Sequence, residues 1–154
     1  MSDSPDDRLM SALRRSSRPD ALRARDDGAD VERLDDRGES LLKMAIDGGD
    51  VQTVGILLSC GADANRVEPP SPGIEERFRT SPLHAAVSNA CVYASESPTL
   101  TAPRPALDIV SLLLDAGGDP DRPMPDGTSP VEVASSYVGS GGEEILGLLR
   151  RNQA

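Results

Sequence analysis

The sequence predicts an all-α fold built from stacked helix-turn-helix units. Apolar residues crowd one side of a helix in 41–46 and again in 54–58, which is the periodicity of short amphipathic helices. Gly61 and Gly117 directly follow apolar runs, where a residue in the left-handed conformation ends a helix without steric cost. Short helices that end on glycine and recur along the chain indicate a repeated unit rather than one irregular bundle.

Helix starts are marked as regularly as helix ends. Ser40, Ser81 and Ser129 stand where a serine hydroxyl can accept a hydrogen bond from the first helical turn. Pro82 and Pro130 follow two of these serines, at the first helical position, where proline is tolerated best. Each unit is therefore predicted to consist of a turn, a helix, a second turn and a second helix.

Two kinds of segment recur. The first kind is Thr80-Ser81-Pro82-Leu83-His84-Ala85-Ala86, with weaker copies at 38–45 and 127–134. The second kind is an apolar run that closes on Gly-Ala-Asp-Ala-Asn at 61–65 and returns at 107–121. A further Gly-Ala-Asp begins at Gly28, which lies 33 positions before Gly61.

These segments and this period resemble the ankyrin repeat, a unit of about 33 residues that opens on Thr-Pro-Leu-His-x-Ala. The resemblance implies an ankyrin-repeat solenoid as one domain over 1–154, with an N-terminal cap at 4–35, repeats at 36–65 and 66–125, and a C-terminal cap at 126–154. We expect the first cap to carry helices at 7–13 and 20–25. The resemblance also implies a structural role for Asp30, Asp63 and Asp119 in the turns.

The third unit departs from the template at two places. Residues 66–79 enlarge its finger turn, and 88–106 replace the usual short link between its two helices. Insertions in repeat proteins form loops and often lie on the binding face, so Phe78, Tyr93 and neighbouring arginines are candidate contacts. The alternative is that both are tolerated surface loops without a partner, because long loops cost little free energy.

Composition narrows the functional class. The 154 residues carry a net charge of -10 and are 37% hydrophobic but only 2% aromatic, so the core is expected to be aliphatic. The acidic N-terminal residues do not resemble a signal peptide, and no apolar run is long enough to span a bilayer. We therefore expect a cytoplasmic protein with no membrane contact, in which Cys60 and Cys91 are free thiols.

Acidic residues concentrate in the expected finger turns. Seven of them fall within fourteen positions, namely Asp26, Asp27, Asp30, Glu32, Asp35, Asp36 and Glu39. The resemblance to ankyrin repeats implies that the finger turns and the exposed sides of the first helices form a concave surface, which would here be acidic. Such a surface attracts a basic partner and repels nucleic acid. The alternative is that these side chains bond their own backbone and that the charge keeps the protein in solution.

No catalytic constellation is evident. His84 is the only histidine, and the resemblance implies that it bonds the backbone of neighbouring turns. The stretch 139–142 is rich in glycine like a phosphate loop, but Glu143 and Glu144 follow it at the helix start and repel an anion. We expect neither an enzyme nor a site for a cofactor or metal.

The predicted function is non-catalytic binding of a protein partner through finger turns, first-helix faces and inserted loops, by a chain that is expected to be monomeric. The alternative is a dedicated inhibitor, such as an immunity protein or antitoxin, of a basic toxin or enzyme. Projection of the repeat template selects ten candidate contact residues: Arg37, Glu39, Met44, Asp47, Arg77, Phe78, Arg79, Met124, Asp126 and Val133. For Met44 and Val133 a packing role is an equal alternative.

Overall fold

The computed structural model describes residues 3–67 and 80–151, and these residues are all-helical. They form eight helices: α1 (Pro5–Arg14), α2 (Arg18–Asp26), α3 (Leu41–Asp47), α4 (Val51–Ser59), α5 (Pro82–Glu96), α6 (Arg104–Asp115), α7 (Pro130–Ser136) and α8 (Glu143–Arg151). Within the described ranges the extended structure is one isolated antiparallel bridge, between Leu34 and Ser40. The all-α class predicted from the sequence is confirmed.

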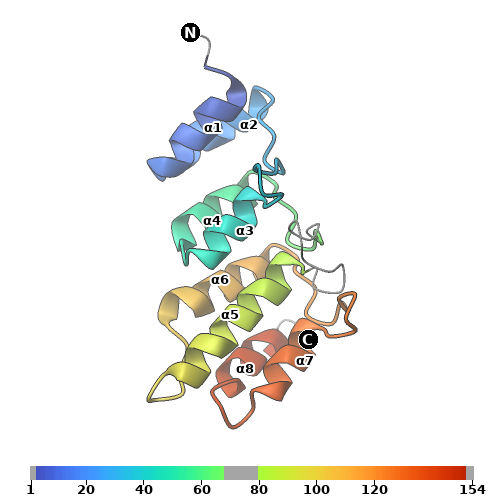
Figure 1. Ribbon diagram of the computed structural model, residues 1–154. Coiled ribbons are helices and arrows are strands. Elements are labelled where there is room, and N and C mark those ends of the chain that lie inside the picture. The colour runs from blue at the N-terminus through green and yellow to red at the C-terminus, as the bar shows by residue number, and fades with distance from the viewer. Residues whose placement is uncertain (1–2, 68–79, 152–154) are drawn as a thin grey trace.

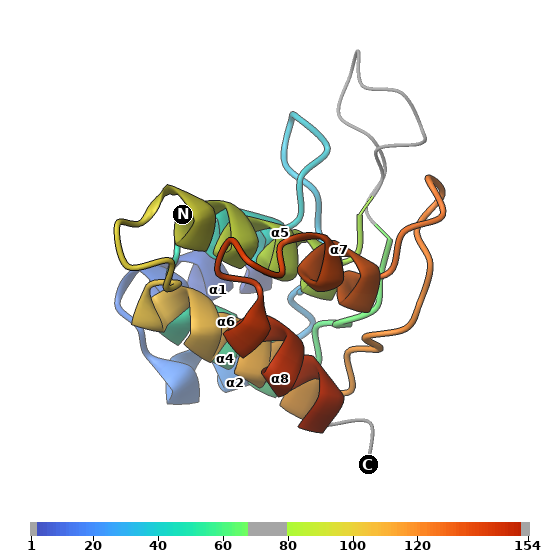
Figure 2. The same cartoon turned by 90° about the horizontal axis from the view of Figure 1, so that it is seen from below.

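The helices pack as antiparallel pairs that follow one another in chain order (Figure 1). The first helices α3, α5 and α7 pack in one row, and the second helices α4, α6 and α8 pack in another. Turns 34–40 and 123–128 project from the same side of these rows, as Figure 2 shows from below. We refer to these two turns as the finger turns.

The predicted starts of α3, α5 and α7 are confirmed, whereas α1 and α2 each begin two residues earlier than predicted, at Pro5 and Arg18. The hydroxyl groups of Ser40, Ser81 and Ser129 each accept a hydrogen bond from the backbone N–H three residues on. Pro82 and Pro130 occupy the first helical position. In α7, Glu132 also reaches back to the N–H of Ser129, so that two backbone donors are satisfied reciprocally.

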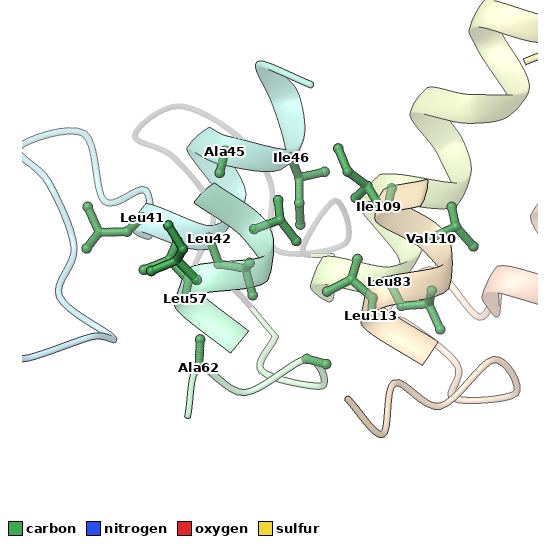
Figure 3. Close-up of a cluster of buried hydrophobic side chains, with 14 of the residues drawn as sticks. Leu41, Leu42, Ala45, Ile46, Leu57, Ala62, Leu83, Ile109, Val110 and Leu113 are labelled. Carbon is green, nitrogen blue, oxygen red and sulfur yellow. The ribbon is translucent and has the colours of Figure 1, made fainter. Parts of the chain in front are cut away.

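Aliphatic side chains form one core that runs between the helix pairs. Leu57 of α4, Leu83 of α5 and Leu113 of α6 are fully buried. Figure 3 shows the seam between the second and third pairs, where Ile46 of α3 and Ile109 of α6 lie side by side. Replacing a fully buried leucine by alanine typically costs about 2–5 kcal/mol, so this seam contributes much of the stability.

The prediction of a long loop over 88–106 is wrong. Residues 88–96 continue α5, and α6 begins at Arg104, so only 97–103 separate the two helices. The reason is that Ala90, Cys91 and Ala94 extend the buried stripe of α5 at helical spacing, and all three are fully buried. With fifteen residues, α5 is about twice as long as α3 or α7, which have seven each.

Three turns of one type close the successive pairs. The side-chain Oδ1 of Asp30, Asp63 and Asp119 accepts the backbone N–H two residues on, at 2.9, 2.8 and 2.9 Å. Asp30, Asp63 and Asp119 are therefore structural residues, as predicted. The glycines before two of these turns, Gly61 and Gly117, have positive φ angles of 96° and 95°.

These turns also bond one another from pair to pair. Glu32 accepts the backbone N–H of Asp63 at 2.7 Å, and Arg66 donates to both the backbone carbonyl and the carboxylate of Glu32. Asn65 then occupies the place of Glu32 and accepts the N–H of Asp119 at 2.8 Å. We call this series of bonds between successive turns the turn ladder.

The last step of the turn ladder repeats the geometry. The Asn65 amide donates to the carbonyl of Gly117 at 2.8 Å, and Arg122 donates to the carbonyl of Asn65 at 2.6 Å. At both steps a side chain accepts the aspartate N–H of the next turn and an arginine of that next turn donates to a backbone carbonyl, so the bonds between turns fix how one helix pair stacks on the next.

We expect Asn65→Ala to lower the free energy of unfolding by about 1 kcal/mol, because it leaves the Asp119 N–H and the Gly117 carbonyl without their partner. Thermal and urea unfolding followed by circular dichroism will measure the loss. Asn65→Asp is the matched control, since it keeps the acceptor for Asp119 and should lose less. An alanine variant as stable as the wild type would contradict a stabilising role for the turn ladder.

Candidate functional site

The candidate site is the surface formed by the finger turns and the exposed sides of the first helices. Met44 of α3 and Val133 of α7 occupy the same place, four residues after the capping serines Ser40 and Ser129. Met44 is 36% exposed, and Val133 is partly buried against the core. Met44 therefore lies at the surface, as the repeat template predicts, whereas Val133 also packs against the core.

A groove lies between α1 and α3. It consists of two adjoining hollows of about 370 and 300 Å³ that share Met10, Arg14, Leu41 and Met44 as lining residues. The groove exists because α1 packs mainly on α2, whereas α3 packs closely on α5. We call it the α1–α3 groove.

The two ends of the α1–α3 groove differ in chemistry. Arg33 and Asp35 line the end nearer the first finger turn, and Asp50 and Thr53 line the other end. Its middle is lined by three apolar side chains and one arginine, Arg14, and the flexible side chains of Met10 and Met44 come from opposite helices. Methionine adapts its shape to irregular partners, so this middle can accept an apolar side chain from another molecule.

Met10 was missed by the sequence reasoning. It lies beside the buried stripe of α1, which consists of Leu9, Ala12 and Leu13, and it is only partly buried. An apolar residue displaced from the core stripe of an amphipathic helix is the signal that could have identified it.

The other predicted contacts are dispersed. Arg37, Asp47 and Asp126 are exposed, and Glu39 is partly exposed; Arg37 and Glu39 belong to the first finger turn and Asp126 to the second. Arg77, Phe78 and Arg79 lie outside the described residues. The structure thus brings Met44 into the groove, leaves Arg37, Glu39 and Asp126 on the finger turns, and places Asp47 at the end of α3.

The proposed partner contact at Met124 is corrected. Its side chain is only 4% exposed, and its sulfur accepts the backbone N–H of Ser81 at 3.2 Å. The backbone of Met124 also closes the second finger turn through a hydrogen bond to Thr128. Met124 therefore anchors this finger turn to the start of α5 and is not available to a partner.

Much of the acidity in the finger turns is used internally. Asp35 Oδ1 accepts the backbone N–H groups of Arg37 and Glu39 at 2.8 and 2.9 Å, and the bond from Glu39 is the main reason that the pKa of Asp35 is lowered. Glu39 shares Lys43 with Asp47. In contrast, Asp36 makes no hydrogen bond or ion pair with the described part of the chain and is exposed.

His84 performs a structural role, although not through the backbone contact that we expected. Its Nε2 lies 3.1 Å from Thr128 Oγ1, and that hydroxyl donates to Asp126 at 2.7 Å. Since the Thr128 proton is used toward Asp126, Nε2–H is the donor to Thr128 and Nδ1 carries the lone pair. That buried Nδ1 has no partner among the described residues, and burial lowers the pKa of His84.

The Cys91 thiol is not activated by its surroundings. Burial raises the pKa of the Cys91 thiol to about 11, so it stays protonated at neutral pH. Among the described residues no group of three or more His, Cys, Asp or Glu side chains is placed to hold a metal ion.

The large hollow of about 670 Å³ beside α1 and α2 is lined mainly by charged side chains, of which Arg15 and Arg23 both pair with Asp20.

The glycine-rich stretch before α8 is closed by a carboxylate. Glu143 accepts the backbone N–H of Gly139, and this bond is the main cause of the lowered pKa of Glu143. A phosphate at this turn would compete with that carboxylate for the same donor. The turn is thus an ordinary connection between α7 and α8.

No protein-family model matches the chain, and no curated protein matches it. In the described residues no helix combines the length and the apolar character that crossing a membrane requires.

The buried His84 predicts a pH-dependent stability. Because its folded pKa is depressed below the ordinary value of 6.5, the neutral ring contributes stability that is present above that pH and is lost as the pH falls through the depressed pKa. We expect the free energy of unfolding to fall between pH 7 and pH 5 in the wild type, and to fall less in His84→Gln. Urea unfolding at each pH measures the free energy of unfolding of both proteins. An equal dependence on pH in the two proteins would contradict the depressed pKa of His84.

Asp35 and Asp36 are adjacent but should respond differently to substitution. Asp35→Ala removes the acceptor for two backbone N–H groups and should lower the melting temperature. Asp36→Lys should leave the melting temperature almost unchanged, because the side chain is solvated, while it slows association with a basic partner at low salt. The opposite ranking of melting temperatures, measured by circular dichroism, would show that the turn is held by other contacts.

Proposed function

We propose that the protein is a member of the ankyrin-repeat family that binds a protein partner without catalysing a reaction. The fold part of this proposal is supported by the paired helices, by the serine caps of α3, α5 and α7, and by finger turns on one side of the helices. The recurrence of the same aspartate turn at Asp30, Asp63 and Asp119 supports a repeated unit.

The α1–α3 groove is the observation that carries the functional proposal. An apolar surface with two methionines from different helices, open beside a finger turn, is suited to receive an apolar side chain of a partner. The exposed carboxylate of Asp36, which makes no bond with the described residues, and the net charge of -10 favour a basic partner over nucleic acid.

A non-catalytic role is consistent with how the reactive side chains are used. The sole histidine joins α5 to the second finger turn, and both cysteines are buried. The polar groups of the candidate site are ion pairs and turn bonds at the surface. Binding through shape and charge is therefore the activity that this surface supports best.

A dedicated inhibitor remains the second candidate, and one observation favours it. The lengthening of α5 occurs in one unit only, which makes this part of the molecule unlike its neighbours. Such an individual feature suits one specific partner better than many partners.

The groove predicts the effect of Met44→Glu. The substitution puts a charge into the apolar middle of the groove at a 36% exposed helical position, so folding should be preserved while partner binding weakens about tenfold. The protein would be immobilised and incubated with native host lysate, and captured proteins would be quantified by mass spectrometry. The leading captured protein would then be purified for titration calorimetry.

Gln52→Glu on α4 is the matched control, because Gln52 is exposed and lies outside the groove-lining residues. One stoichiometric partner that is lost with Met44→Glu and kept with Gln52→Glu supports binding through the groove. A partner retained equally by both variants would place the binding surface elsewhere. Blocking of that partner's own activity would favour the inhibitor over an adaptor.

A further inference from the structure

The lengthened α5 creates a surface that the other first helices lack. At about 1.5 Å per residue, its fifteen residues exceed the seven of α3 by about 12 Å. The C-terminal part of α5 therefore continues past the end of α3, as Figure 1 shows. Asn89 and Tyr93 lie one helical turn apart on the side of this part that faces α3.

The two sides of the C-terminal part of α5 differ in whether another segment covers them. On the side of α7, the turn 137–142 lies directly against it, since a Cβ placed at Gly141 would be 2.7 Å from the Ala94 Cβ. On the side of α3, a hollow of about 270 Å³ remains open, and Tyr93 is 48% exposed beside it. We call this hollow the α5 pocket.

The walls of the α5 pocket are mostly apolar. Ile46, Ala86 and Ile109 line it from the core, and Pro103, Pro105 and Ala106 line it from the start of α6. Its volume is below the range of about 300–1,000 Å³ of pockets that hold drug-sized ligands, and it suits a single large side chain.

One carboxylate gives the α5 pocket its polarity. Asp47 is the only charged residue among those that line it, and its side chain is 44% exposed. Asp47 accepts from Lys43 at 2.8 Å and from the Asn89 amide at 3.1 Å. Lys43 also lies 3.9 Å from Glu39, so the three charges leave a net negative charge beside the pocket.

The position of Asp47 strengthens the preference for a cation. It is the last residue of α3, where the backbone carbonyls make a helix end partially negative and an added carboxylate is unfavourable. Arg104, which stands in the sequence between two of the lining prolines but does not itself line the pocket, is paired with Asp108 at 3.2 Å. A cationic group beside Asp47 would offset this excess of negative charge.

We propose that the α5 pocket binds an extended segment of a basic protein partner, which inserts one aliphatic side chain and places an adjacent lysine or arginine against Asp47. This inference rests on the proposed function and adds a second contact region to it. It assigns Tyr93 and Asp47 as specificity residues: Tyr93 forms the outer wall for the apolar side chain, and Asp47 selects the neighbouring cation.

The test uses two blocked tetrapeptides, serine-leucine-arginine-serine and serine-leucine-glutamate-serine, titrated into the ¹⁵N-labelled full chain. Amide shifts should saturate at Gly48, Gly49 and Tyr93, and the arginine peptide should bind about fivefold tighter than the glutamate peptide at low salt. Asp47→Asn should bring the two affinities together. Tyr93→Ala should weaken both peptides about fivefold, whereas Val92→Ala, an exposed neighbour outside the pocket, should change neither.

Three results would overturn the inference: equal affinity of the two peptides for the wild type, no saturable shift at the pocket, or shifts centred on the α1–α3 groove. Equal binding of 3-methylbutan-1-ol would also overturn it, because the pocket would then serve a small apolar ligand. The comparison of the two peptides on the wild-type protein tests the inference even if a variant fails to fold. Since the Met44→Glu experiment does not touch this pocket, failure here leaves the proposed function standing.

Discussion

The turn ladder is the constraint on which the rest of the structure depends. A pair of short helices buries only one face, and seven-residue helices such as α3 and α7 are too short to be stable in isolation. The bonds from Glu32 to Asp63 and from Asn65 to Asp119 set one turn above the next at a fixed spacing. With that spacing fixed, the aliphatic faces of successive pairs meet, and the finger turns project on one side.

The α1–α3 groove lies beside the turn that follows α2. Asp6 of α1 accepts the backbone N–H of Asp30 at 2.8 Å and lies 3.8 Å from Arg33, so these contacts tie α1 to the turn that follows its own partner helix. Here α1 stays with α2 and does not close on α3. The sparse packing of α1 on α3 thus supplies the opening that carries the proposed function, because closer packing would fill it.

Local chemistry made the starts of α3, α5 and α7 predictable. Serine caps, prolines at first helical positions and glycines at helix ends act within a few residues, so Ser81, Pro82 and Gly61 could be assigned from the sequence alone. The length of α5 was not predicted, because its C-terminal part is covered by a turn far along the chain, where Ala94 lies against Gly141. The side chain of Met124 was misassigned for the same reason, since its partner Ser81 lies 43 residues away. Asp35 and Asp36 are alike in sequence, and only the fold shows that Asp35 bonds the backbone of the turn, whereas Asp36 is exposed and bonds none of the described residues.

The two apolar openings arise from opposite departures from regular stacking. At the α1–α3 groove neighbouring first helices pack too loosely, and at the α5 pocket one first helix extends past its neighbour. Both leave apolar side chains exposed next to carboxylates, Asp35 in the first case and Asp47 in the second. Because each carboxylate already bonds its own surroundings, it is held in place before any partner arrives, and little side-chain entropy is lost when a cation approaches. A basic partner that engages both openings would gain affinity from the connection between its two contacts, provided that its length spans them.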